Sequence, residues 1–104
     1  MTAEKMLDLW LTARIDYNSY LVNLCKYHDA WRGETTREMT DAATEDRDVY
    51  VRIRTETRNG QYVEERLRQL LKEYADNSEA QSKVRITLAQ WRHLKVRAKE
   101  LERA

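Results

Sequence analysis

The chain has 104 residues, of which 36% are charged and 41% are hydrophobic, and its formal net charge is +1. Apolar side chains recur along the whole chain, which excludes wholesale disorder, and the length suits a single domain over residues 1–104. Cys25 is the only cysteine, so no internal disulfide can form, and no apolar run approaches the roughly 20 residues that span a bilayer. We therefore expect a cytoplasmic protein without a membrane partner.

Residues 2–31 predict a long helix with two apolar lines, because the apolar residues of each line recur at helical spacing. The first line consists of Met6, Trp10, Ala13, Tyr17, Tyr20, Leu21, Leu24, His28 and Trp31. The second line, about 100° further round the helix, consists of Leu7, Leu11, Ile15, Val22 and Cys25. A helix with two apolar lines contacts neighbours on two sides, so it is either the central helix of its own bundle or part of a subunit interface.

The second segment, residues 35–74, has apolar residues at helical spacing, but its middle allows two interpretations. Residues 49–58 alternate apolar and polar side chains and precede Asn59-Gly60, a pattern typical of a strand before a tight turn. No alternating strand follows, however, and an unpaired strand is not stable. We expect a helix over residues 49–58 and a kink or break near Asn59-Gly60, with the strand as the alternative.

Two further patterns mark helix ends. Gly33 suits the left-handed position that closes a helix, and residues 35–38 then match a capping box. A second capping box, residues 78–81, opens a third segment whose apolar residues recur at helical steps up to Leu101. We therefore predict an all-α bundle of three long helices, the second kinked or broken near Asn59-Gly60. An unbroken second helix would extend beyond its neighbours, and the extension could pack against a second copy of the chain. An intertwined or coiled-coil-like dimer is therefore the alternative form of this fold.

No residue pattern in the chain indicates a catalytic, metal or cofactor site. Cys25 and His28 share a helix face, but a metal site needs three or four such ligands. Asp46 and Glu56 fall where apolar residues are expected, and we expect each to pair with a basic residue of a neighbouring helix or subunit. Buried carboxylates can also serve acid–base chemistry, so a small all-helical enzyme is one possible function. We favour it less than protein binding or nucleic-acid binding.

Charge is distributed unevenly along the chain. Residues 1–48 hold ten acidic and six basic side chains, whereas residues 83–104 hold seven basic and two acidic ones. A basic stripe is predicted on the last helix, consisting of Arg85, Arg92, Lys95, Lys99 and Arg103. Such a stripe can neutralise phosphates, so nucleic-acid binding is the alternative function. The acidic first half could instead be the partner of this stripe, within the bundle or across a dimer.

The aromatic residues are three Trp and six Tyr, which bury a ring while a polar group stays in water and which are enriched at protein interfaces. Four of them lie off or at the ends of the best apolar lines and are our candidates for exposed protein contacts: Tyr27, Trp31, Tyr50 and Tyr62. We expect a non-catalytic protein-interaction module, such as an adaptor, assembly factor or inhibitor of a larger complex, of bacterial, plasmid or phage type and able to form a homodimer. Residues 46–62 are the first place to look for its function.

Overall fold

The computed structural model describes residues 1–32, 34–58 and 61–103, and it describes their side chains except those of residues 25–36. Within these residues the chain forms four helices: α1 (Ala3–Arg32), α2 (Glu34–Thr57), α3 (Val63–Glu73) and α4 (Ser78–Arg103). No strand occurs among them, so the predicted all-α class is confirmed. The predicted number of three helices is not, because the second predicted segment is divided into α2 and α3.

A break was expected near Asn59-Gly60, and α2 ends at Thr57 while α3 begins at Val63. Because α2 is helical as far as Thr57, the strand alternative for residues 49–58 was wrong. Asn59-Gly60, the predicted break point, lies outside the described residues. On its far side Tyr62 adopts φ 57° and ψ 36°, a left-handed conformation that is uncommon for a residue with a Cβ atom. The Tyr62 carbonyl accepts a hydrogen bond from the Arg66 backbone N–H at 2.9 Å, which starts α3 in a new direction.

The turn between α3 and α4 is closed by a side chain one residue earlier than predicted. The Asn77 Oδ1 atom accepts a hydrogen bond from the Ala80 backbone N–H at 3.1 Å, so Asn77 rather than Ser78 is the capping residue of α4. Gln81, the last residue of the predicted capping box, donates from Nε2 to the Leu71 carbonyl at 2.9 Å. Gln81 therefore ties α4 to α3. The side chain of Thr35, in the other predicted capping box, lies outside the described residues.

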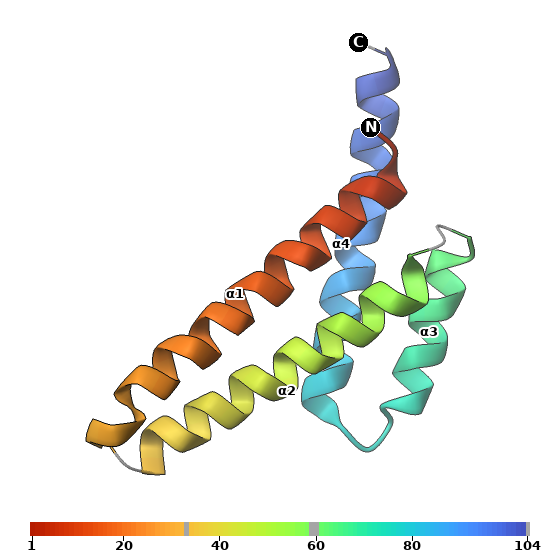
Figure 1. Ribbon diagram of the computed structural model, residues 1–104. Coiled ribbons are helices and arrows are strands. Elements are labelled where there is room, and N and C mark those ends of the chain that lie inside the picture. The colour runs from red at the N-terminus through yellow and green to blue at the C-terminus, as the bar shows by residue number, and fades with distance from the viewer. Residues whose placement is uncertain (33, 59–60, 104) are drawn as a thin grey trace.

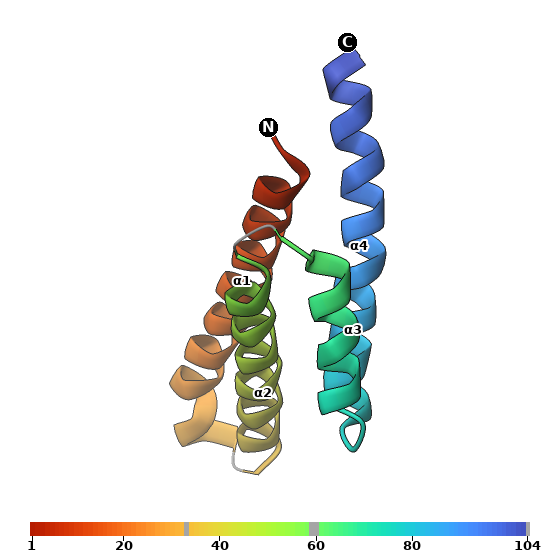
Figure 2. The ribbon, with the colours of Figure 1, turned by 90° about the vertical axis from the view of Figure 1, so that its right-hand side faces the viewer.

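The four helices form two antiparallel hairpins, α1–α2 and α3–α4, which pack on each other as two layers (Figures 1 and 2). The buried core includes Leu7, Leu11, Ile15, Tyr50, Ile53, Val63, Leu67, Leu70, Val84 and Trp91. The molecule measures 53 × 32 × 18 Å, and its radius of gyration of 15.8 Å exceeds the roughly 13 Å of a compact domain of about 100 residues. It is therefore elongated. Both chain ends lie at the same end of the molecule (Figure 1).

Ion pairs join α2 to the second layer. The Asp46 carboxylate lies 3.7 Å from Lys83 Nζ on α4, and the Glu56 carboxylate lies 3.3 Å from Arg66 Nη1 on α3. Both carboxylates therefore pair with basic residues of neighbouring helices, as the sequence led us to expect. Their role is to hold the two hairpins together, because each negative charge at the layer boundary faces a positive one.

Candidate functional site

The first helix, α1, packs on the rest of the molecule with one face only. This face carries Ala3, Leu7, Leu11, Ile15, Asn18 and Val22, all of which are buried. It corresponds to the second of the two apolar lines seen in the sequence. Because its neighbours lie on that side, α1 is not the central helix of the bundle, and the other apolar line needs a different explanation.

Four residues of that other line, Ala13, Tyr17, Tyr20 and Leu24, are exposed, and Leu9, which was not part of the line, is exposed on the same side of α1. The exposed residues follow one another at steps of four, four, three and four, which places them within about 80° of the helix circumference. They are Leu9, Ala13, Tyr17, Tyr20 and Leu24, and we call them the outward stripe. The exposed fractions of its two tyrosines, Tyr17 and Tyr20, are 57% and 61%. Within the described residues neither tyrosine hydroxyl has a hydrogen-bond partner.

The outward stripe is comparable in area to the largest apolar patch on a typical monomer. A tyrosine can bury about 150–250 Å², so two that are more than half exposed leave together about 200–300 Å² in contact with solvent. With Leu9 and Leu24, which are 51% and 40% exposed, the stripe falls in the range of about 300–600 Å² typical of the largest apolar patch on a monomer. Patches of this size are often functional.

One margin of the outward stripe is fixed by a contact between α1 and α2. The half-buried Trp10 ring lies edge to face against the Tyr50 ring, with centroids 6.0 Å apart. The Arg14 guanidinium lies 5.4 Å from the centroid of the Trp10 ring. Trp10 is therefore held in place beside the stripe, and a partner would meet a rigid edge there.

Other exposed apolar residues do not form a comparable surface. Ile86, Val96 and Leu101 are exposed on α4, and Met39 is exposed on α2. Those on α4 are ten and five residues apart and are separated by exposed polar and charged side chains. Among the residues described, the outward stripe of α1 is therefore the apolar surface with continuous helical spacing.

The four predicted aromatic contacts have different outcomes. Tyr50 is 5% exposed, so the expectation that it lies on the surface was wrong. Its position on α2 falls on the core-facing side with Ile53, although the sequence placed it off the best apolar lines. Tyr62 is exposed, but it lies alone at the start of α3. The side chains of Tyr27 and Trp31 lie outside the described residues. Tyr17 and Tyr20 lie on one of the best apolar lines of the sequence. For that reason they were not among the predicted exposed contacts.

The predicted basic stripe of α4 is partly occupied by internal contacts. Arg92 contacts Glu64 of α3, with its Nη2 and Nε atoms 2.9 and 3.0 Å from the same carboxylate oxygen. This hydrogen bond lowers the pKa of the Glu64 carboxyl. Lys95 lies over the Trp91 ring, 5.7 Å from its centroid. Arg85, Lys99 and Arg103 make neither an ion pair nor a ring contact among the described residues.

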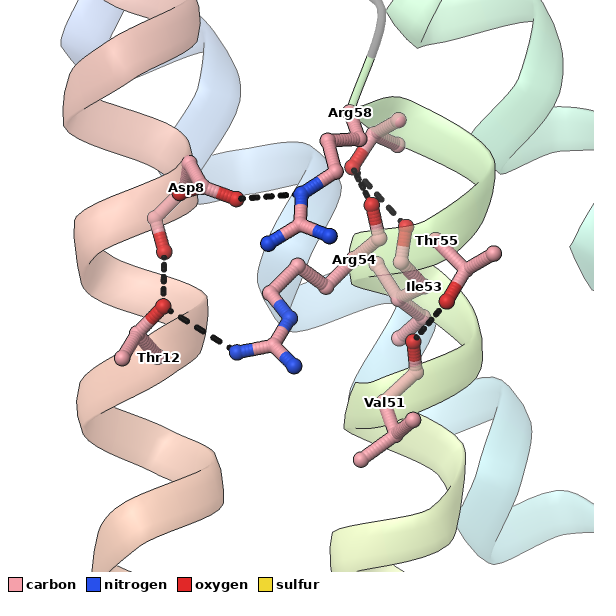
Figure 3. A network of polar contacts seen from close by, with 8 residues as sticks. Asp8, Thr12, Val51, Ile53, Arg54, Thr55 and Arg58 are labelled. Carbon is pink, nitrogen blue, oxygen red and sulfur yellow. Dashed lines mark hydrogen bonds and ion pairs between the residues drawn. The ribbon is translucent and has the colours of Figure 1, made fainter.

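A polar network ties α1 to the end of α2 (Figure 3). Arg54 Nη1 donates to Thr12 Oγ1 at 3.3 Å, and the Thr12 hydroxyl donates to the Asp8 carbonyl at 2.8 Å. Arg58 Nε lies 4.0 Å from Asp8 Oδ1, which is beyond hydrogen-bond reach, and this oxygen has no hydrogen bond among the described residues. Arg58 itself is largely exposed. We interpret the network as a link between the two helices.

In the described part of the chain, no three histidine, cysteine, aspartate or glutamate side chains are placed to hold a metal ion. The side chains of Cys25 and His28 lie outside that part. No helix among the described residues combines the length and the apolar character needed to cross a membrane.

Comparison with protein-family models, with curated proteins and with solved structures found no match to this chain. Its function therefore has to be argued from its own residues.

Proposed function

We propose that this chain is a cytoplasmic, non-catalytic protein-binding module and that the outward stripe of α1 is its contact surface. The observation that carries this proposal is a continuous apolar stripe, centred on Tyr17 and Tyr20, on the solvent side of a helix whose other face is fully packed. Burying such a stripe against a partner removes apolar surface from water, which is the main driving force of association.

The composition of the stripe supports a protein partner in particular. Tyrosine is enriched among the residues that contribute most to binding at protein interfaces, because its ring is large and rigid and its hydroxyl can remain wet. Charged side chains of both signs, Lys5, Arg14 and Asp16, are exposed on the same helix. A helix with an apolar centre and a charged rim is the arrangement found in many protein complexes. An adaptor or an inhibitor of a larger complex would act in this way.

Nucleic-acid binding has less support from the structure. Of the five residues of the basic stripe, Arg92 is engaged by Glu64 and Lys95 lies on Trp91. The remaining basic residues are interspersed with Glu100 and Glu102 on the last turns of α4. Fewer free cations reduce the number of phosphates that the helix can neutralise, and with it the affinity.

The proposal is tested by affinity capture followed by a direct binding measurement. The wild-type chain, a Tyr17→Glu/Tyr20→Glu variant and an Ile86→Glu/Val96→Glu control are each immobilised and exposed to nuclease-treated extract of the cells that make the protein. All four substituted side chains are exposed, so the variants keep the fold. We expect one defined protein to bind the wild type and the control but not the stripe variant.

The captured protein is then purified, and its affinity is measured by calorimetry. Loss of two central tyrosines is expected to weaken binding by at least about tenfold. Equal binding to the stripe variant and the control would show that the outward stripe is not the contact surface. Binding to the wild type that is seen in a parallel untreated extract but not in the nuclease-treated one would favour nucleic acid.

A further inference from the structure

We propose that a second copy of this chain occupies the outward stripe, with the two α1 helices antiparallel about a two-fold axis beside Tyr17. This inference rests on the proposed function, because it names one partner of the same surface. Two observations favour a second copy over an unrelated protein: the order of large and small side chains in the stripe, and the balance of charge on α1. The area that two stripes can bury then indicates the strength of the contact.

The side chains of the stripe are complementary in size to those of a second stripe that runs in the opposite direction. When two α1 helices run antiparallel with the axis beside Tyr17, Leu9 lies opposite Leu24 of the second copy. Ala13 then lies opposite Tyr20 of the second copy, so the smallest residue of the stripe faces one of the largest. Because an isologous interface uses the same surface twice, it requires this kind of self-complementarity. The two Tyr17 rings meet beside the axis.

Charge also permits the contact between copies. Residues 1–24 contain two basic and three acidic side chains, so each copy brings a net charge of only −1 to the contact. The exposed face of α4 is different, because Arg85, Lys99 and Arg103 would face their own copies there. Like charges opposite each other disfavour association. Both α1 and α4 carry several exposed apolar residues, and α1 is therefore the one suited to contact a second copy of itself.

The area of the stripe indicates how strong the dimer is. Two stripes of about 300–600 Å² bury together about 600–1,200 Å², below or at the lower limit of about 1,200 Å² for stable interfaces. Contacts of this size are typical of weak and transient complexes. We therefore expect monomer and dimer to exchange, with the dimer favoured as the concentration rises.

Sedimentation equilibrium of the full chain tests this expectation at concentrations from about 1 μM to about 1 mM, a range that covers weak dissociation constants. The average mass of the wild type should rise from 12.5 kDa toward twice that value. Tyr17→Lys places two like charges beside the axis and should keep the protein monomeric. Val96→Lys, an equally exposed substitution on α4, should leave the dimer unchanged.

A mixing experiment tests the antiparallel orientation. Leu9→Lys alone and Leu24→Glu alone should each stay monomeric, because each places a charge against a leucine of the second copy. An equimolar mixture should regain the dimer, because the introduced lysine then faces the introduced glutamate. A parallel pair would place position 9 opposite position 9 and would show no such recovery. Far-UV circular dichroism of every variant confirms that the helices are intact.

The outcomes separate this inference from the proposed function. A wild-type chain that stays at 12.5 kDa over the whole range overturns the second copy. If protein capture still depends on Tyr17 and Tyr20 in that case, the proposed function stands. A dimer that survives Tyr17→Lys overturns the choice of surface. A dimer that is lost with Tyr17→Lys, together with no stripe-dependent capture, supports the second copy and removes the external partner.

Discussion

The Trp10 and Tyr50 rings meet edge to face across the α1–α2 hairpin, with their planes at 83° and their centroids 6.0 Å apart. Aromatic pairs favour this geometry because the positive edge of one ring approaches the negative face of the other. The two residues differ in their burial. Tyr50 is part of the buried core, whereas Trp10 remains half-buried at the margin of the outward stripe. One contact thus stabilises the core and holds the edge of the candidate interface.

The burial of Tyr50 predicts a loss of stability in alkaline solution. Burial raises the pKa of the Tyr50 hydroxyl above the ordinary tyrosine value of about 10; Arg14 opposes this effect and Asp46 adds to it. The unfolded chain therefore loses this proton at a lower pH than the folded chain does. As pH rises above about 10, the free energy of unfolding should fall.

Tyr50→Phe removes the titrating group and keeps the ring. Urea unfolding of both proteins should give a constant difference in free energy up to about pH 9. Above about pH 10 the difference should move against the wild type. A difference that remains constant up to about pH 11 would contradict the burial of the Tyr50 hydroxyl.

The Asp46–Lys83 ion pair predicts a charge-dependent contact between the layers. Its side chains are only 29% and 25% exposed, so the pair is less screened by solvent than a surface pair. Asp46→Lys should lower the free energy of unfolding by about 1 kcal/mol, because it places two positive charges at the boundary. Adding Lys83→Asp should recover most of the loss, as measured by urea unfolding at low salt.

Asp48→Lys is the matched control, since Asp48 lies two residues away and its side chain is 68% exposed. Its effect should stay within about 0.5 kcal/mol. Equal effects of Asp46→Lys and Asp48→Lys would show that the pair contributes nothing specific to the contact between the layers.

The left-handed backbone of Tyr62 predicts a stabilising substitution. A residue with a Cβ atom is strained in this conformation by about 1–2 kcal/mol, whereas glycine adopts it freely. The Tyr62 side chain is 67% exposed, so little packing is lost when it is removed. Tyr62→Gly should raise the thermal midpoint, with a gain of about 0.5–1 kcal/mol after the greater flexibility of glycine in the unfolded chain.

Gln61→Gly is the control for Tyr62→Gly. Gln61 is exposed and precedes Tyr62, so glycine there should lower the thermal midpoint, because it adds flexibility to the unfolded chain and leaves Tyr62 in its left-handed conformation. A midpoint that falls for both variants would show that the conformation of Tyr62 carries no strain.

Periodicity was enough to predict the helices, but not which face of each helix is buried. On α1 both apolar lines have helical spacing, and the packing of α2 and α4 against one of them decides which line is exposed. Composition held a clue, because the buried line is mostly aliphatic and the exposed one contains Tyr17 and Tyr20. At Tyr50 the sequence pattern gave the wrong side of α2, because neighbouring residues of a helix differ by about 100° of rotation, which is enough to exchange core and surface.

The contacts of the basic stripe could not be predicted from a local sequence pattern, because they join residues far apart in the chain. Arg92 and Glu64 are 28 positions apart, and only the packing of α3 on α4 brings them together. The cap of α4 is a smaller case. Asn77 and Ser78 are both good capping residues, and the path of the preceding turn decides in favour of Asn77.

The chain begins in one layer and ends in the other, although both ends lie at the same end of the molecule (Figure 2). Any change in the angle between the two hairpins would therefore change the distance between Met1 and Arg103, which are both exposed. Energy transfer between fluorescent dyes at these two positions would report the angle between the two hairpins. Neither position belongs to the outward stripe, so energy transfer between the dyes could follow the angle while a partner is bound.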